Sequence, residues 1–142
     1  MKSFGFIIVI LVGTVALMGM GSLGGQPQGT APKTEVNIHA QIVDRSGVTT
    51  EVAQFSMEGK VYLEGARGDG QMTVLFKKLQ GIAFGKVEGQ IVPAELKFKN
   101  GENLKLKLRK SSVFYGSTRY GTFQIRAGNI QKIEFLPTAT QG

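Results

Sequence analysis

The chain has 142 residues, a formal net charge of +7, one histidine and no cysteine. The absence of cysteine excludes structural disulfides and a lipid-modified cysteine anchor, and the histidine and cysteine content excludes the usual zinc-binding motifs. No segment matches a phosphate-binding loop, so we predict no cofactor, no metal site and no enzymatic activity.

The first predicted element is an apolar run at residues 4–23, which has no ionisable side chain and follows Lys2. A signal peptide has an apolar stretch of roughly 7–15 residues, whereas a membrane-spanning helix needs about 20. Residues 1–24 are therefore predicted to be either a signal peptide or a transmembrane anchor. Because the positive flank stays in the cytoplasm, we expect the rest of the chain at the periplasmic face of the inner membrane or outside the cell.

The first six residues, Met-Lys-Ser-Phe-Gly-Phe, resemble the leader of type IV pilin-like proteins, which is cut after a glycine. Most members of that family carry glutamate at the fifth mature position, where this chain has Ile10. Helix-breaking residues also follow at 24–29. The resemblance implies a pilin-like protein as a more distant alternative.

Glycine, glutamine and proline make residues 25–32 a predicted flexible linker. Residues 33–137 are predicted to form one all-β domain, because apolar residues alternate with polar ones and glycine recurs about every ten residues. The tail at residues 138–142 is expected to be frayed.

The clearest predicted hairpin lies at residues 94–108, around Asn100 and Gly101. A two-residue turn would place the apolar residues of the two strands on opposite faces. A three-residue loop at residues 99–101 pairs Leu96 with Leu104 and gives Gly101 the left-handed position that such loops require. This register directs Leu96, Phe98, Leu104, Leu106 and Leu108 inward and directs Lys97, Lys105, Lys107 and Arg109 outward.

The domain also contains a predicted internal repeat, with units at about residues 36–84 and 91–135. At an offset of 54 the matched residues are Ala40, Ile42, Gly47, Thr50 and Val52 with Ala94, Leu96, Gly101, Leu104 and Leu106. At an offset of 51 they are Gly65, Gly70, Met72, Val74, Leu79, Gln80, Ile82 and Phe84 with Gly116, Gly121, Phe123, Ile125, Ile130, Gln131, Ile133 and Phe135. Chance similarity between alternating strands is the alternative explanation.

Each unit is predicted to hold a hairpin, a glycine-rich loop, a strand, a short turn and a closing strand, and the loop of the first unit is expected at residues 65–70. Two such four-stranded units would bury their apolar faces against each other as a small antiparallel β-sandwich or barrel. The best core candidates are Ile82, Phe84, Ile133 and Phe135. Lysines on the hairpin at residues 94–109 are predicted to protect an exposed sheet edge.

The net charge is concentrated in the second unit. Residues 97–126 hold eight lysines or arginines and one acidic residue, and the rest of the chain has nine of each kind. A predicted loop at residues 114–123 adds aromatic side chains beside this basic surface. The candidate residues for binding an anion or a partner are Lys97, Lys105, Lys107, Arg109, Tyr115, Arg119 and Tyr120. A solvated β face with the loop aromatics in the core is the alternative interpretation.

Candidates for catalysis are few. His39 lies in an alternating strand without an evident partner. Glu95 and Glu102 flank the basic hairpin, but neither has the apolar setting that acid catalysis by a carboxyl group requires.

We therefore predict a non-enzymatic, exported module, membrane-tethered through residues 4–23 if these are uncleaved. It would bind an anionic lipid, a polysaccharide or an envelope protein through its basic β face. Nucleic acid is not expected as a partner, because residues 119–123 lack the pattern of an RNA-recognition strand and an exported protein seldom meets RNA. The alternative is a structural subunit of an envelope or surface assembly that self-associates through strand edges or through the apolar run.

Overall fold

The computed structural model of the protein describes residue 34 and residues 36–137. The predicted N-terminal segment, the linker and the tail lie outside these described residues. Within this part of the chain, no helix is long and apolar enough to cross a membrane.

The described residues form ten strands and two single-turn 3₁₀ helices. The strands are β1 (His39–Asp44), β2 (Thr49–Met57), β3 (Tyr62–Arg67), β4 (Gly70–Leu75), β5 (Leu79–Phe84), β6 (Ile91–Phe98), β7 (Asn103–Arg109), β8 (Val113–Thr118), β9 (Gly121–Arg126) and β10 (Ile130–Leu136). The 3₁₀ helices are η1 (Phe76–Lys78), between β4 and β5, and η2 (Ala127–Asn129), between β9 and β10.

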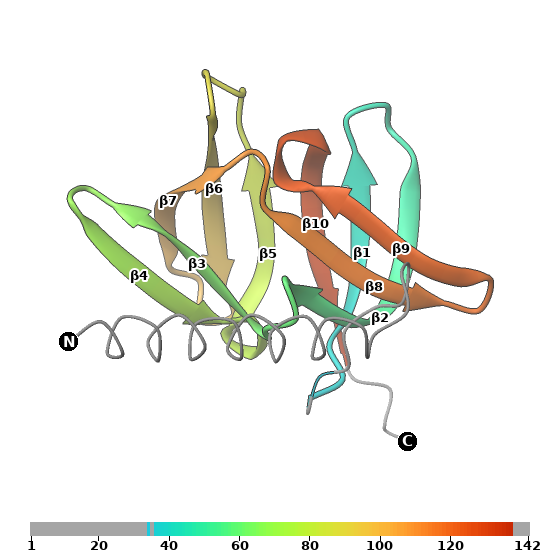
Figure 1. Ribbon diagram of the computed structural model, residues 1–142. Helices are drawn as coiled ribbons and strands as arrows, with labels where there is room; N and C mark the ends of the chain where they lie inside the picture. Colours follow the sequence, from blue (N-terminus) through green and yellow to red (C-terminus); the bar gives the residue numbers. More distant parts are fainter. Residues whose placement is uncertain (1–33, 35, 138–142) are drawn as a thin grey trace, which may run out of the picture. The chain divides into compact units, whose positions relative to one another are not determined.

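All ten strands belong to one antiparallel sheet in the order β4-β3-β7-β6-β5-β10-β1-β2-β8-β9. The prediction of an all-β antiparallel fold is thus confirmed. The architecture is one curled sheet (Figure 1), rather than two packed sheets or a closed barrel. Because β4 and β9 each have a neighbour on only one side among the described strands, the sheet has two free edges in this part of the chain.

The β6–β7 hairpin has the register that was predicted from the alternation of apolar and polar residues on its two strands. Leu96 pairs with Leu104 and Ala94 with Leu106. The loop closes through a hydrogen bond from the Phe98 N–H to the Glu102 carbonyl at 2.8 Å, and Gly101 has a φ of +94°. Its outward-facing lysines lie on interior strands, so the expectation that they protect an edge was wrong.

The predicted loops at residues 65–70 and 114–123 are in fact short turns at residues 68–69 and 119–120, and the residues before these turns belong to β3 and β8. Gly65 and Gly116 lie within them rather than in turns, because each glycine leaves room for a side chain of a neighbouring strand. A Cβ at Gly116 would lie 2.5 Å from the Val52 Cβ, and one at Gly65 would lie 3.1 Å from the Leu106 Cβ. The first half of the domain (β1–β5) and the second half (β6–β10) therefore have five strands each, instead of the predicted four.

The second hairpin of each half pairs with a strand of the other half, an arrangement that we call exchanged hairpins. The β3–β4 hairpin pairs with β7, and the β8–β9 hairpin pairs with β2. If β1–β5 are exchanged with β6–β10, the strand order is simply reversed. Both halves therefore have the same sequence of elements and equivalent neighbours in the sheet.

The core lies on one face of the curled sheet, where the apolar residue of each alternating pair is buried. Among the predicted core residues, Ile82, Phe84 and Ile133 are buried and Phe135 is half-buried. Phe55 lies at the centre of an aromatic cluster, with its ring centroid 5.1 Å from that of Phe76 and 5.6 Å from that of Phe114. The opposite face of the sheet carries the polar and charged side chains.

Candidate functional site

The basic residues predicted as a binding surface lie together on the outward face of β6 and β7. We call Lys97, Lys105, Lys107 and Arg109 the basic face. Lys105, Lys107 and Arg109 are alternate residues of β7, so they point to the same side of the sheet, and all four side chains are exposed. The intervening residues, Leu106 and Leu108, are buried on the opposite side and hold β7 in place.

Within the described structure, the cations of the basic face have no acidic partner at ion-pair distance. Among the described residues, the one ion pair is between Lys60 and Glu64, with an N–O distance of 3.7 Å. Glu95 lies opposite Lys105 in the β6–β7 register without forming such a pair. Arg67 of β3 contacts the backbone of β7, where its Nη1 donates to the Lys105 carbonyl at 3.4 Å. The basic face therefore has positive charge available for an external anion.

Tyr115, Arg119 and Tyr120 lie in a different part of the sheet. Tyr115 is a half-buried residue of β8, and the other two lie in the turn between β8 and β9. The Arg119 guanidinium lies 5.1 Å from the centre of the Tyr120 ring, which is 86% exposed. In the sheet order, β6, β5, β10, β1 and β2 lie between β7 and β8. Thus the predicted seven-residue site divides into the basic face, the tip of the β8–β9 hairpin with Arg119 and Tyr120, and Tyr115 within β8.

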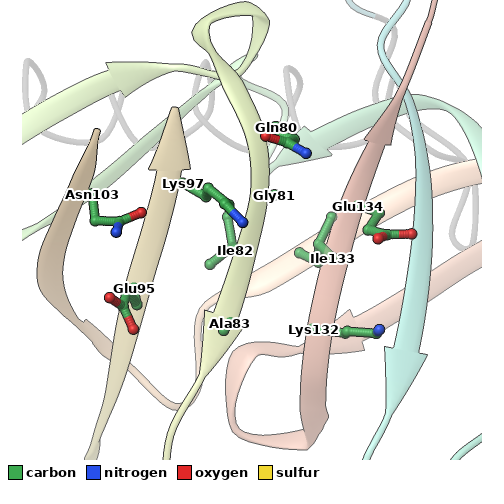
Figure 2. Close-up of a pocket in the computed structure, with 10 residues that line it drawn as sticks. All are labelled: Gln80, Gly81, Ile82, Ala83, Glu95, Lys97, Asn103, Lys132, Ile133 and Glu134. Atoms are coloured by element: carbon green, nitrogen blue, oxygen red, sulfur yellow. The ribbon is translucent and has the colours of Figure 1, made fainter. Parts of the chain in front are cut away.

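A groove next to the basic face was not predicted from the sequence. It has a volume of about 350 Å³, and Gly81 and Ala83 of β5 form its floor. Figure 2 shows Glu95 and Lys97 on one side of this floor and Lys132 and Glu134 on the other. Gly81 and Ala83 leave room for the groove because their side chains are absent or small, and a Cβ at Gly81 would lie 2.8 Å from the Ile133 carbonyl. Two small residues in the middle of a strand were the signal that the sequence offered.

The three residues considered for catalysis, His39, Glu95 and Glu102, lie in different elements of the described structure. His39 is a half-buried residue of β1. Glu95 lies within β6, whereas Glu102 lies in the hairpin loop and its Oε1 accepts a hydrogen bond from Asn100 at 3.2 Å. In the part of the chain that the structure describes, no three histidine, aspartate or glutamate side chains are grouped to hold a metal ion.

The fold and this surface define a class of protein: an all-β domain built on one curled antiparallel sheet with a basic outward face. The chain belongs to a family of proteins described as uncharacterised, which matches residues 34–137. A relative from Aquifex aeolicus (strain VF5), also described as an uncharacterized protein, is 27% identical over 110 residues, or 78% of this chain and 83% of the relative. No solved structure matches the chain significantly.

Proposed function

We propose that this domain is a non-enzymatic binding module that docks onto an anionic surface of the cell envelope through its basic face. The observation that carries the proposal is the group of exposed cations on β6 and β7, none of which is neutralised by an ion pair within the described structure. Clustered lysines and arginines near an anionic lipid surface contribute about 1 kcal/mol each to binding.

Export is part of the same proposal and is supported by the sequence. The apolar run at residues 4–23 and the preceding Lys2 are typical of an export signal or an anchor. A domain delivered to the outer side of the inner membrane would meet anionic lipid head groups directly. We therefore favour lipid over a polysaccharide or an envelope protein as the surface that the basic face contacts.

The test is sedimentation of the fragment Ala31–Gly142, which forms one compact unit, with vesicles that contain or lack anionic lipid. The wild-type fragment should bind only the anionic vesicles, and binding should weaken as salt is raised. Replacing Lys105 and Lys107 by glutamate should reduce the partition constant at low salt by at least about 30-fold, because it removes two favourable charges and adds two repulsive ones.

A matched control is the double variant Lys78→Glu/Lys86→Glu. It changes the net charge by the same amount, but these exposed lysines lie outside the basic face. It should retain most of the binding, because a localised face and not the overall charge is proposed to make the contact. Equal loss in both double variants, or binding that is independent of salt, would reject the proposal.

We also infer that the domain arose by duplication of a five-stranded unit. Equivalent residues of the two halves form reciprocal hydrogen bonds between the halves. The Arg45 N–H donates to the Asn129 carbonyl at 3.0 Å, and the Lys99 N–H donates to the Lys78 carbonyl at the same distance. Arg45 matches Lys99 at the offset of 54, and Lys78 matches Asn129 at the offset of 51.

The turn before each closing strand supports the same inference. The Phe76 N–H donates to the Val61 carbonyl at 3.1 Å, and the equivalent Ala127 N–H donates to the Ser112 carbonyl at 2.8 Å. Chance similarity between alternating strands would not reproduce these contacts between the same aligned positions. Duplication therefore accounts for both the repeated sequence pattern and the exchanged hairpins.

A further inference from the structure

The free edge at β4 lacks the features by which sheet edges usually avoid pairing. Natural edge strands carry charges, prolines or bulges. β4 reads Gly-Gln-Met-Thr-Val-Leu, without a charge or a proline, and its register with β3 continues without a shift over six residue pairs. A regular, uncharged edge of this kind is a template for a further strand.

The faces of β4 restrict how a second copy could pair with it. Residues opposite each other in an antiparallel pair lie on the same face of the sheet. Val74 is buried and Met72 packs against the core, whereas Gln71, Thr73 and Leu75 are exposed on the other side. A two-fold axis at Thr73 keeps these faces matched, because it places Met72 opposite Val74 of the second copy and Gln71 opposite Leu75.

Charges at the two ends of β4 select this register over its neighbours. Asp69 lies in the turn just before β4 and Lys77 lies in η1 just after it, each four residues from Thr73. An axis at Thr73 therefore brings the end of β4 that carries Asp69 in one copy beside the end that carries Lys77 in the other, twice in the dimer. Both side chains are exposed, and neither forms an ion pair within the described residues. An axis at Met72 or Val74 would also keep the faces matched but would misalign these charges.

The other free edge does not share this property. β9 carries a charge at Arg126, and the positions that match Asp69 and Lys77 at the offset of 51 are Tyr120 and Gly128. Pairing of β9 with a second β9 would therefore gain no ion pair at either end. The charge pattern distinguishes β4 from the strand that occupies the equivalent place in the other half.

We propose that β4 pairs with β4 of a second copy, antiparallel and about a two-fold axis at Thr73, so that the two sheets become continuous. The contact is isologous: the same strand serves both copies and the assembly closes as a dimer. This pairing leaves the basic face of β6 and β7 unchanged. The dimer proposal can therefore fail without affecting the proposed binding to anionic surfaces, and the reverse also holds.

Cysteine cross-linking of the full chain in mild detergent tests the interface, because the protein contains no native cysteine. Thr73→Cys should give a covalent dimer on oxidation, since residues opposite each other in a sheet have Cβ atoms about 4.5–5.5 Å apart, close to disulfide range. Gln124→Cys, at the equivalent position of β9, is the matched control and should remain mostly monomeric. Absence of the Thr73→Cys dimer, or equal cross-linking of both variants, would overturn the proposal.

A charge exchange in the Thr73→Cys background tests the register. Asp69→Lys and Lys77→Asp should each lower the dimer fraction at low salt by at least about fivefold, because each places like charges opposite each other twice. Combining the two substitutions restores opposite charges and should restore cross-linking. Failure of the combined variant to recover would refute the register with its axis at Thr73, provided that its circular dichroism spectrum matches that of Thr73→Cys.

Discussion

Asp44 shows how a single side chain organises the first hairpin loop. Its Oδ1 accepts hydrogen bonds from the Val48 N–H at 3.0 Å, the Ser46 N–H at 2.9 Å and the Ser46 hydroxyl at 3.0 Å. These bonds, chiefly the one from Val48, lower the pKa of Asp44 below its ordinary value of 3.8, although partial desolvation acts in the opposite direction. The ionised carboxylate is therefore the form that stabilises the loop.

This shift predicts a specific pH dependence for the Asp44→Asn variant. Because the folded-state pKa is below the unfolded-state value, the stabilisation is complete above pH 4 or so and is lost as the pH falls through the folded-state pKa. The variant should be less stable than the wild type at neutral pH, and the difference should shrink at about pH 3. Urea denaturation at both pH values measures it.

Asp69→Asn serves as the control for this experiment, since the described structure gives Asp69 no comparable set of hydrogen bonds. It should show no such convergence with the wild type. A difference between Asp44→Asn and the wild type that stays the same at both pH values would contradict the assigned role of the carboxylate.

The glycines show how much sequence reasoning can recover about individual residues. The role of Gly101 was predictable, because a three-residue hairpin loop requires a left-handed residue at that position. Gly65 and Gly116 were predicted in loops, but they lie in strands and make room for side chains from the other half of the domain. The need for glycine in a turn can be recognised from the neighbouring residues. The need for glycine at a close contact between strands depends on residues that are distant in the sequence.

At the scale of elements, β8 can lie against β2 because Gly116 has no side chain. Val52 is buried, and its Cβ and Cγ2 would each lie 2.5 Å from a Cβ at position 116. Gly116→Ala should therefore reduce the free energy of unfolding by about 1–3 kcal/mol, as overpacking of a core usually does. Thermal and urea denaturation would measure the loss.

A double-mutant cycle assigns that loss to the contact between the two strands. Val52→Gly removes the Val52 Cβ as well as both Cγ atoms and so relieves the overlap, and the double variant should therefore lose less stability than the sum of the two single variants. Gly70→Ala is the matched control, because its added Cβ would meet only the Arg67 carbonyl at 3.6 Å, and it should change stability by no more than about 0.5 kcal/mol. Simple additivity would argue against the steric explanation.

The β6–β7 hairpin and its basic face were largely predictable because both follow from local rules. Alternation fixes which residues share a face, and parity fixes the register across a short loop. The separation of Arg119 and Tyr120 from Lys105 and Lys107 was not predictable in this way. The β7–β8 connection is short, but it leads from one half of the sheet to the other, so neighbours in sequence become distant in the sheet.

At the scale of the whole molecule, the exchanged hairpins make each half dependent on the other. Glu88 and Ile91 exchange backbone hydrogen bonds across the turn between the halves, and Gly89 lies in it with a φ of +64°. A chain divided there, into residues 31–88 and 89–142, should fold only when both fragments are present, because β3 and β8 find their second neighbours in the opposite fragment. Co-expression and purification through a tag on one fragment would measure this.

Each fragment expressed separately is the control and should lack the circular dichroism and dispersed nuclear magnetic resonance spectra of a folded β domain. Mixing the separate fragments after refolding should restore those spectra. A fragment that folds alone as a monomer would show that the halves are independent, contrary to the exchanged arrangement.

The sequence alone determined the β class, the inward and outward faces of the hairpin, the repeated pattern and the location of the excess positive charge. These properties follow from residue periodicity and composition, which act within a few residues. Only the tertiary structure decided that the sheet is single and open, that the hairpins are exchanged and that the groove over Gly81 lies beside the basic face. The alternation of apolar and polar residues determines which face of a strand is buried. Which strands become its neighbours in the sheet depends on side-chain fit between residues that are distant in the sequence, as between Val52 and Gly116.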